Sequence, residues 1–168
     1  MVDIASVVAA IERTPDCKLY PSAGIPSVGK PHGLPEDVAA FYELCGGAIL
    51  FERSPYSVRI VAPASFVLAN PVILVGLTEN QLDSTRQEIS WSWYLIAEGD
   101  SGQYFSIDLA PERLGRCYYT FWDSHAMRGH SPIVAKSYSN FLERMLSNRG
   151  QEWYWERPGE ASLGDAYD

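Results

Sequence analysis

Hydrophobic residues near the amino terminus recur at helical spacing. Four of them fall at positions i, i+3, i+4 and i+7, which places them on one helix face: Ile4, Val7, Val8 and Ile11. The Thr14-Pro15 pair predicts the end of this helix, because proline cannot continue the hydrogen-bond ladder. Residues 15–33 are rich in proline, glycine and serine, and we expect a long loop there.

A second helix is predicted from the sequence Leu34-Pro35-Glu36-Asp37 onward. Proline presets the backbone of a first helical turn, and acidic residues there complement the positive end of the helix dipole. The stripe predicted to be buried contains Leu34, Val38, Phe41, Tyr42 and Cys45. Gly46 and Gly47 should stop the helix, because glycine readily adopts the left-handed conformation of a C-terminal cap.

Shorter apolar runs follow the two glycines. Residues 48–51 and 57–62 are predicted strands. Residues 63–68 indicate one or two helical turns, whereas residues 71–75 fit either a strand or a packed loop. Residues 78–88 are polar, so we expect an exposed segment, and the pattern is compatible with a short helix there.

The middle of the chain alternates in the manner of β-structure. Residues 90–97, 103–109 and 116–122 are predicted strands, and residues 98–102 are a tight turn, which together favour an antiparallel meander. Strand alternation assigns Phe105, Ile107 and Leu109 to one face and Tyr104, Ser106 and Asp108 to the other.

A last amphipathic helix precedes a change in composition. Its apolar stripe is Tyr138, Phe141, Leu142, Met145 and Leu146. Asn148 and Gly150 are expected to cap it. We therefore predict one domain over residues 1–150, followed by an aromatic and acidic C-terminal tail over residues 151–168.

Composition and charge limit the classes of partner. At 168 residues, with 46% hydrophobic and 20% charged residues, the chain fits one globular domain. Its net charge of −8 disfavours nucleic acids and anionic membranes as partners but is compatible with a basic protein. Half of this net charge lies beyond residue 150, so the domain itself is only mildly acidic.

The cysteines and the amino terminus favour the cytoplasm. Cys17, Cys45 and Cys117 are odd in number and far apart, which does not indicate a disulfide framework. The first residues lack the basic region of a signal peptide, and no apolar run is long enough to span a membrane.

Candidate catalytic and metal-binding motifs are weak. Gly99-Asp100-Ser101-Gly102 copies part of the nucleophile loop of chymotrypsin-like proteases, but Gln103 replaces the next glycine and the chain is too short for a double barrel. Cys117, His125 and His130 lack the spacing of metal ligands. The sequence therefore predicts no metal, no cofactor and no catalytic residue.

Acidic and aromatic residues gather on the predicted meander. Carboxylate pairs such as Asp100 with Asp108, or Glu98 with Asp123, could act as acid and base only in a shared pocket, and a solvated acidic face is the simpler interpretation. The aromatic residues there are Trp91, Trp93, Tyr94, Tyr104, Tyr118, Tyr119, Phe121 and Trp122. They suit either a protein-binding surface or a core built from cross-strand pairs.

The order of several motifs is more specific than any of them alone. Leu34-Pro35-Glu36-Asp37 leads through Phe41-Tyr42 to Cys45-Gly46-Gly47, and the pattern continues with residues 98–109, Gly115 and residues 133–142. Over roughly residues 30–147 the chain resembles the SMI1/KNR4 (SUKH) superfamily. It departs from that pattern in a longer segment over residues 66–90 and in Cys45-Gly46, where the superfamily usually has an Asn-Gly pair.

The resemblance implies an α+β fold in which helices pack against a curved, mainly antiparallel β-sheet. It also implies structural roles for Leu34, Pro35, Gly46, Gly47, Gly102 and Gly115. Asp108 is then either a structural hydrogen-bonding residue or a contact with a partner.

Bacterial members of the superfamily are similar to immunity proteins, so the resemblance implies a non-enzymatic protein that neutralises a cognate toxin. We expect a toxin with a basic surface, such as a nuclease, and no direct binding of nucleic acid or membrane. The candidate contacts are Glu98, Asp100, Asp108, Trp122 and Asp123. A scaffold module without a toxin partner is the alternative, and an unrecognised hydrolase is less favoured.

Overall fold

The first predicted helix is present in the computed structural model, which describes residues 2–168. Helix α1 spans Ile4–Arg13, and its four predicted apolar residues are buried. The Asp3 carboxylate accepts hydrogen bonds from two backbone N–H groups of the first turn. The helix ends at Thr14, as predicted from the following proline.

Helix α2 (Glu36–Leu44) begins directly after Pro35, with two acidic residues in its first turn as predicted. The helix ends just before Gly46 and Gly47, as predicted, but the predicted left-handed glycine cap is wrong, because Gly46 does not have a positive φ. Cys45, with φ −154° and ψ 173°, is extended, so the helix ends without a left-handed residue at that position. Gly47 has φ +115°, and a Cβ there would lie 2.8 Å from the carbonyl oxygen of Ile60. Its smallness is therefore needed where the chain approaches a neighbouring strand.

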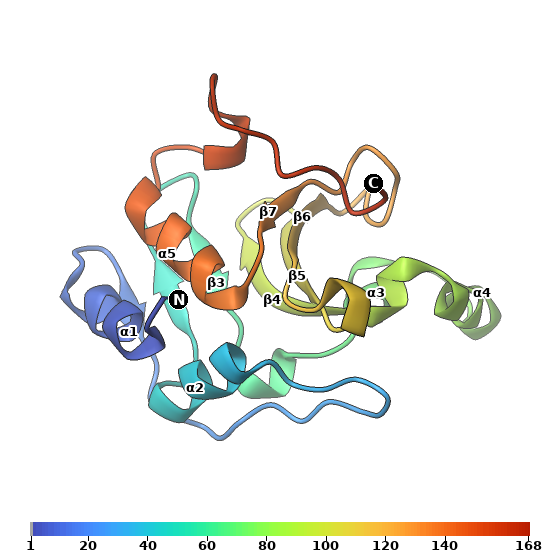
Figure 1. Cartoon of the computed structure of the whole chain (residues 1–168), viewed down its shortest axis with the longest axis horizontal. Helices are drawn as coiled ribbons and strands as arrows, with labels where there is room; N and C mark the ends of the chain where they lie inside the picture. The colour runs from blue at the N-terminus through green and yellow to red at the C-terminus, as the bar shows by residue number, and fades with distance from the viewer. Residues whose placement is uncertain (1) are drawn as a thin grey trace.

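Seven antiparallel strands form one sheet in sequence order. They are β1 (Lys18–Leu19), β2 (Ala48–Leu50), β3 (Val58–Ile60), β4 (Trp93–Gly99), β5 (Gln103–Asp108), β6 (Cys117–Phe121) and β7 (Ile133–Ala135). Figure 1 shows the sheet curving without closing into a barrel. The predicted α+β fold, with helices packed on an antiparallel sheet, is confirmed.

One face of the sheet packs against the larger helices. Figure 1 shows α1, α2 and α5 (Tyr138–Asn148) on the same side of the strands. Phe105 and Ile107 are fully buried in this main hydrophobic cluster, as their alternation predicted. Helix α5 ends with Arg149 in the left-handed conformation (φ +56°), so Arg149 takes the capping position predicted for its neighbours.

The opposite face is covered over part of its area by a second, smaller cluster. Its buried apolar residues are Ala69, Ile73, Trp93, Tyr118, Ile133 and Ala166. Residues 71–73, predicted as a strand or packed loop, belong instead to helix α3 (Ala69–Ile73). Residues 89–92 form a 3-10 turn, within which the Ser92 hydroxyl donates to the Ile89 carbonyl. The predicted strand therefore starts three residues later than expected.

Several short elements complete the chain. Helix α4 spans Glu79–Ser84, and single 3-10 turns span Pro63–Ser65, Thr85–Gln87, Pro111–Arg113 and Tyr154–Glu156. In the described part of the chain, no helix has the length and apolarity needed to cross a membrane.

The C-terminal segment packs against the rest of the protein. Trp153 stacks on Trp155 with ring centroids 5.2 Å apart, and both rings contact Phe105 of the main cluster. Further along, the Ile133 N–H donates to the Gly164 carbonyl at 2.9 Å, so the last residues run beside β7. Figure 1 shows this segment returning over β6 and β7. It thereby covers an edge strand that would otherwise be open.

Candidate partner-binding surface

The turn between β4 and β5 lies beside the end of β6. The Trp122 N–H donates to the Gly102 carbonyl at 3.0 Å, which joins the two segments. Gly102 has φ +83°, and a Cβ there would lie 2.5 Å from Cδ1 of the Trp122 indole. Trp122 is 56% exposed, so its indole is held against the turn while most of it faces solvent.

Three acidic residues lie at the same end of the sheet as Trp122, in or beside the β4–β5 turn and directly after β6. We call the set the hairpin-end surface: Glu98, Asp100, Trp122 and Asp123. Asp100 and Asp123 are exposed, and Glu98 is partly exposed. Across the strands, Glu98 lies opposite both Arg59 and Tyr104. Within residues 2–168 none of these three carboxylates belongs to an ion pair, so their charges are free to attract a partner.

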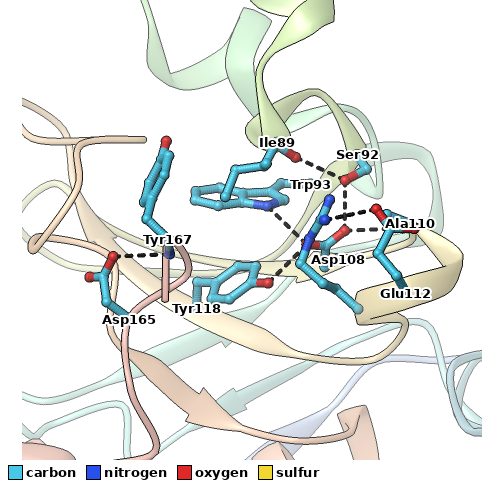
Figure 2. Close-up of polar contacts among 10 residues, drawn as sticks. Ile89, Ser92, Trp93, Asp108, Ala110, Glu112, Tyr118, Asp165 and Tyr167 are labelled. Atoms are coloured by element: carbon cyan, nitrogen blue, oxygen red, sulfur yellow. Dashed lines mark hydrogen bonds and ion pairs between the residues drawn. The ribbon is translucent and has the colours of Figure 1, made fainter.

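Asp108 lies elsewhere, fully buried at the opposite end of β5. Its carboxylate accepts hydrogen bonds from the side chains of Ser92 (2.6 Å), Trp93 (3.2 Å), Arg113 (2.8 Å) and Tyr118 (2.8 Å), and from a backbone N–H. Figure 2 shows these groups converging on the carboxylate from neighbouring strands and turns. The structure therefore does not bring Asp108 to the hairpin-end surface.

Tyr118 and Arg113 keep the protons with which they donate to Asp108. Burial, followed by the charge of Asp108, raises the pKa of the Tyr118 hydroxyl, so it remains a donor. Burial alone would lower the pKa of Arg113, but the hydrogen bond and charge of Asp108 outweigh burial and raise it. A charged guanidinium and a neutral phenol thus both donate to the same carboxylate.

A second buried polar network places a hydroxyl, an imidazole and an amide oxygen in the order found in catalytic triads. The Thr120 hydroxyl lies 2.9 Å from Nδ1 of His125, and Nε2 of His125 lies 2.9 Å from the side-chain oxygen of Asn70. Because an amide oxygen only accepts, Nε2 carries the proton and Nδ1 accepts from Thr120. Burial lowers the pKa of His125 to about 4, which keeps the ring neutral. Thr120 is fully buried, so a substrate cannot reach its hydroxyl in this conformation.

The remaining candidate residues form no metal site. Among residues 2–168, no three or more His, Cys, Asp and Glu side chains are grouped to hold an ion. Cys117 is fully buried and its pKa is raised chiefly by burial, which disfavours the thiolate that binds metals. His130 is exposed in the loop before β7.

Most of the aromatic residues on the meander build the core. Seven of the eight are buried or half-buried, and Trp122 is the exposed one. The loop after Trp122 also exposes Met127, to 50%, which sequence reasoning did not identify. A single methionine in a polar loop has no periodic pattern, so only its exposure, five residues after Trp122, marks it as a candidate contact.

Comparison with known proteins gives one full-length relative. No family model matches the chain. Over 167 residues it is 41% identical to Immunity protein YokJ of Bacillus subtilis (strain 168), a match that covers 99% of this chain and 97% of the relative. The chain belongs to the YokJ family. Because the match is nearly end to end, the segments around α4 and after residue 150 both lie within the part shared with YokJ.

Proposed function

We propose that the protein is an immunity protein that binds and neutralises a toxin delivered between bacterial cells. The observation that carries the proposal is the near full-length similarity to Immunity protein YokJ. The sequence motifs between Leu34 and Leu142 add support, since their order resembles the SMI1/KNR4 (SUKH) superfamily. We also propose that it acts in the cytoplasm, where its three free cysteines would stay reduced.

Neutralisation would proceed by occlusion and not by catalysis. The hairpin-end surface offers one exposed indole and three carboxylates that form no ion pair within residues 2–168. Carboxylates accelerate the encounter with a basic cleft, and a desolvated tryptophan anchor slows dissociation. Nuclease toxins fit this chemistry, because an enzyme that acts on a polyanion carries a basic cleft.

Asp108 is left out of the proposed contacts. Its carboxylate is fully buried and already accepts five hydrogen bonds, so it has no remaining capacity to meet a partner. The proposed contact set is therefore the hairpin-end surface, with Met127 added because of its exposure.

The proposal is tested with the toxin encoded beside this gene. The toxin domain is expressed in a sensitive host with or without this protein, and growth and complex formation between the purified proteins are measured. Restored growth together with a stable complex is expected, whereas an unrelated toxin of the same class should still kill. Loss of growth despite co-expression, with no complex between the purified proteins, would refute the proposed function.

A further inference from the structure

The segment of residues 75–88, which contains α4, extends away from the body of the protein. We call this segment the α4 arm. Figure 1 shows α4 beyond α3, away from the sheet and from the other helices. None of the residues of α4 is buried, and residues 75–81 are all exposed. The arm therefore adds no buried apolar surface to either hydrophobic cluster.

Local interactions give the arm a defined conformation. Thr78 and Gln81 form a reciprocal capping box at the start of α4. Arg86 pairs with Asp83 at 3.1 Å, and its guanidinium lies 4.8 Å from the centroid of the Trp91 ring. An isolated six-residue helix is unstable in water, so these contacts hold a shape that core packing does not require.

The arm exposes apolar side chains at its base. Val75 is 77% exposed, the highest value among the large hydrophobic residues, and Leu77 is 38% exposed. The arm also carries three acidic residues against one basic residue. Exposed apolar side chains bordered by negative charge are complementary to a concave apolar pocket with a basic rim.

A stable interface needs more contact area than the hairpin-end surface provides by itself. A specific protein complex buries about 800 Å² on each partner, contributed by about 20–30 residues. The hairpin-end surface has four residues, so it would supply only a small part of that area. Within residues 2–168, Val75 and Leu77 are the only exposed large hydrophobic residues that lie within two positions of each other along the chain.

We propose that the α4 arm is a second docking element that inserts Val75 and Leu77 into an apolar pocket within the basic cleft of the toxin. This inference rests on the proposed immunity function and assigns a further part of its interface. The convex arm would fill the cleft, while the flanking acidic residues of α4 meet the cations at its rim.

The test measures the affinity of the purified full-length protein for the toxin domain encoded beside its gene. The variant Val75→Ser/Leu77→Ser is compared with Ile25→Ser/Leu44→Ser, which changes two other residues of 47% and 50% exposure. We expect the arm variant to bind at least about tenfold more weakly and the control to bind like the wild type. Unchanged affinity of the arm variant would overturn the inference while leaving the immunity function intact.

Amide hydrogen exchange provides a second readout that needs no substitution. Residues 76–88 should exchange more slowly in the complex than in the free protein, because an inserted arm loses contact with solvent. Unchanged exchange there would contradict insertion.

Oligomeric state distinguishes a different partner for the arm. If the wild-type protein self-associates, and Val75→Ser/Leu77→Ser abolishes this without loss of toxin affinity, the arm binds a second copy of this chain and the inference is overturned. If the wild-type protein fails to bind the toxin at all, the proposed function itself is refuted.

Discussion

The indole of Trp122 rests on the backbone of Gly102, so closely that a Cβ on this glycine would lie 2.5 Å from Cδ1. Gly102→Ala should therefore displace the indole and also strain a backbone with φ +83°. We expect a loss of about 1 kcal/mol in unfolding free energy and a weaker complex with the toxin. Urea unfolding and a binding titration measure the two effects.

A double-mutant cycle separates the two roles of Gly102. If the glycine acts on binding by placing the indole, then Gly102→Ala should weaken binding much less once Trp122 has been changed to Ala. Additive losses of affinity would instead show that the glycine acts on the complex by another route.

The buried carboxylate of Asp108 is predicted to hold the end of the meander together. Asp108→Asn removes the buried counter-charge of the largely buried Arg113 guanidinium and leaves it only the exposed carboxylate of Glu112. Breaking such a pair costs about 3–5 kcal/mol, so the urea midpoint should fall strongly. Glu112→Gln is the control, because the Glu112 side chain is 65% exposed and should contribute less than about 1 kcal/mol. Equal effects of the two substitutions would contradict this role of Asp108.

His125 predicts a specific pH dependence of stability. Its pKa is about 4 in the folded protein against an ordinary value of 6.5 for histidine, so the unfolded chain binds the proton more tightly. The neutral imidazole therefore contributes about 3 kcal/mol to the free energy of unfolding. This contribution is fully present above pH 6.5 and is lost as the pH falls towards 4. His125→Gln should reduce the slope of unfolding free energy against pH in this window. An unchanged slope would show that the imidazole is not kept neutral by the fold.

The last six residues are predicted to seal the second cluster. Ala166 is 3% exposed, so Ala166→Asp places a charge in an apolar site and should cost about 3 kcal/mol of unfolding free energy. Ala161→Asp makes the same chemical change at an exposed position and should be nearly neutral. Thermal unfolding compares the two, and equal melting temperatures would mean that the C-terminal segment does not contribute to stability.

Local patterns predicted the elements that have strong local signals. Helix α1 follows a clear 3.6-residue period, and β5 alternates apolar and polar residues from Phe105 to Asp108 after a Gly-rich turn. Helix α3 has only five residues, and its place is set by tertiary contacts such as the bond between Asn70 and His125. Strands β1 and β7 have two and three residues, too few for a period to be visible.

The position of the hairpin-end surface was partly predictable, because it also follows from a local sequence pattern. The meander predicts that Glu98, Asp100, Trp122 and Asp123 lie near one end of the sheet, because a tight turn precedes an antiparallel strand. The alternation of residues along β5 assigns Asp108 to one face of the sheet but does not predict which residues cover that face. The cover comes from residues distant in the chain, such as Tyr167, whose ring lies 6.4 Å from that of Trp93.

The central claim is that the hairpin-end surface binds the toxin, and charge reversal tests it most directly. Asp100→Lys/Asp123→Lys is compared with Glu12→Lys/Glu43→Lys, which makes the same change in net charge at exposed positions on the helices. Affinity and association rate for the toxin encoded beside the gene are measured at low and high salt. We expect at least about tenfold weaker binding for the first variant and near wild-type affinity for the second. Equal affinity of the two variants would contradict the central claim.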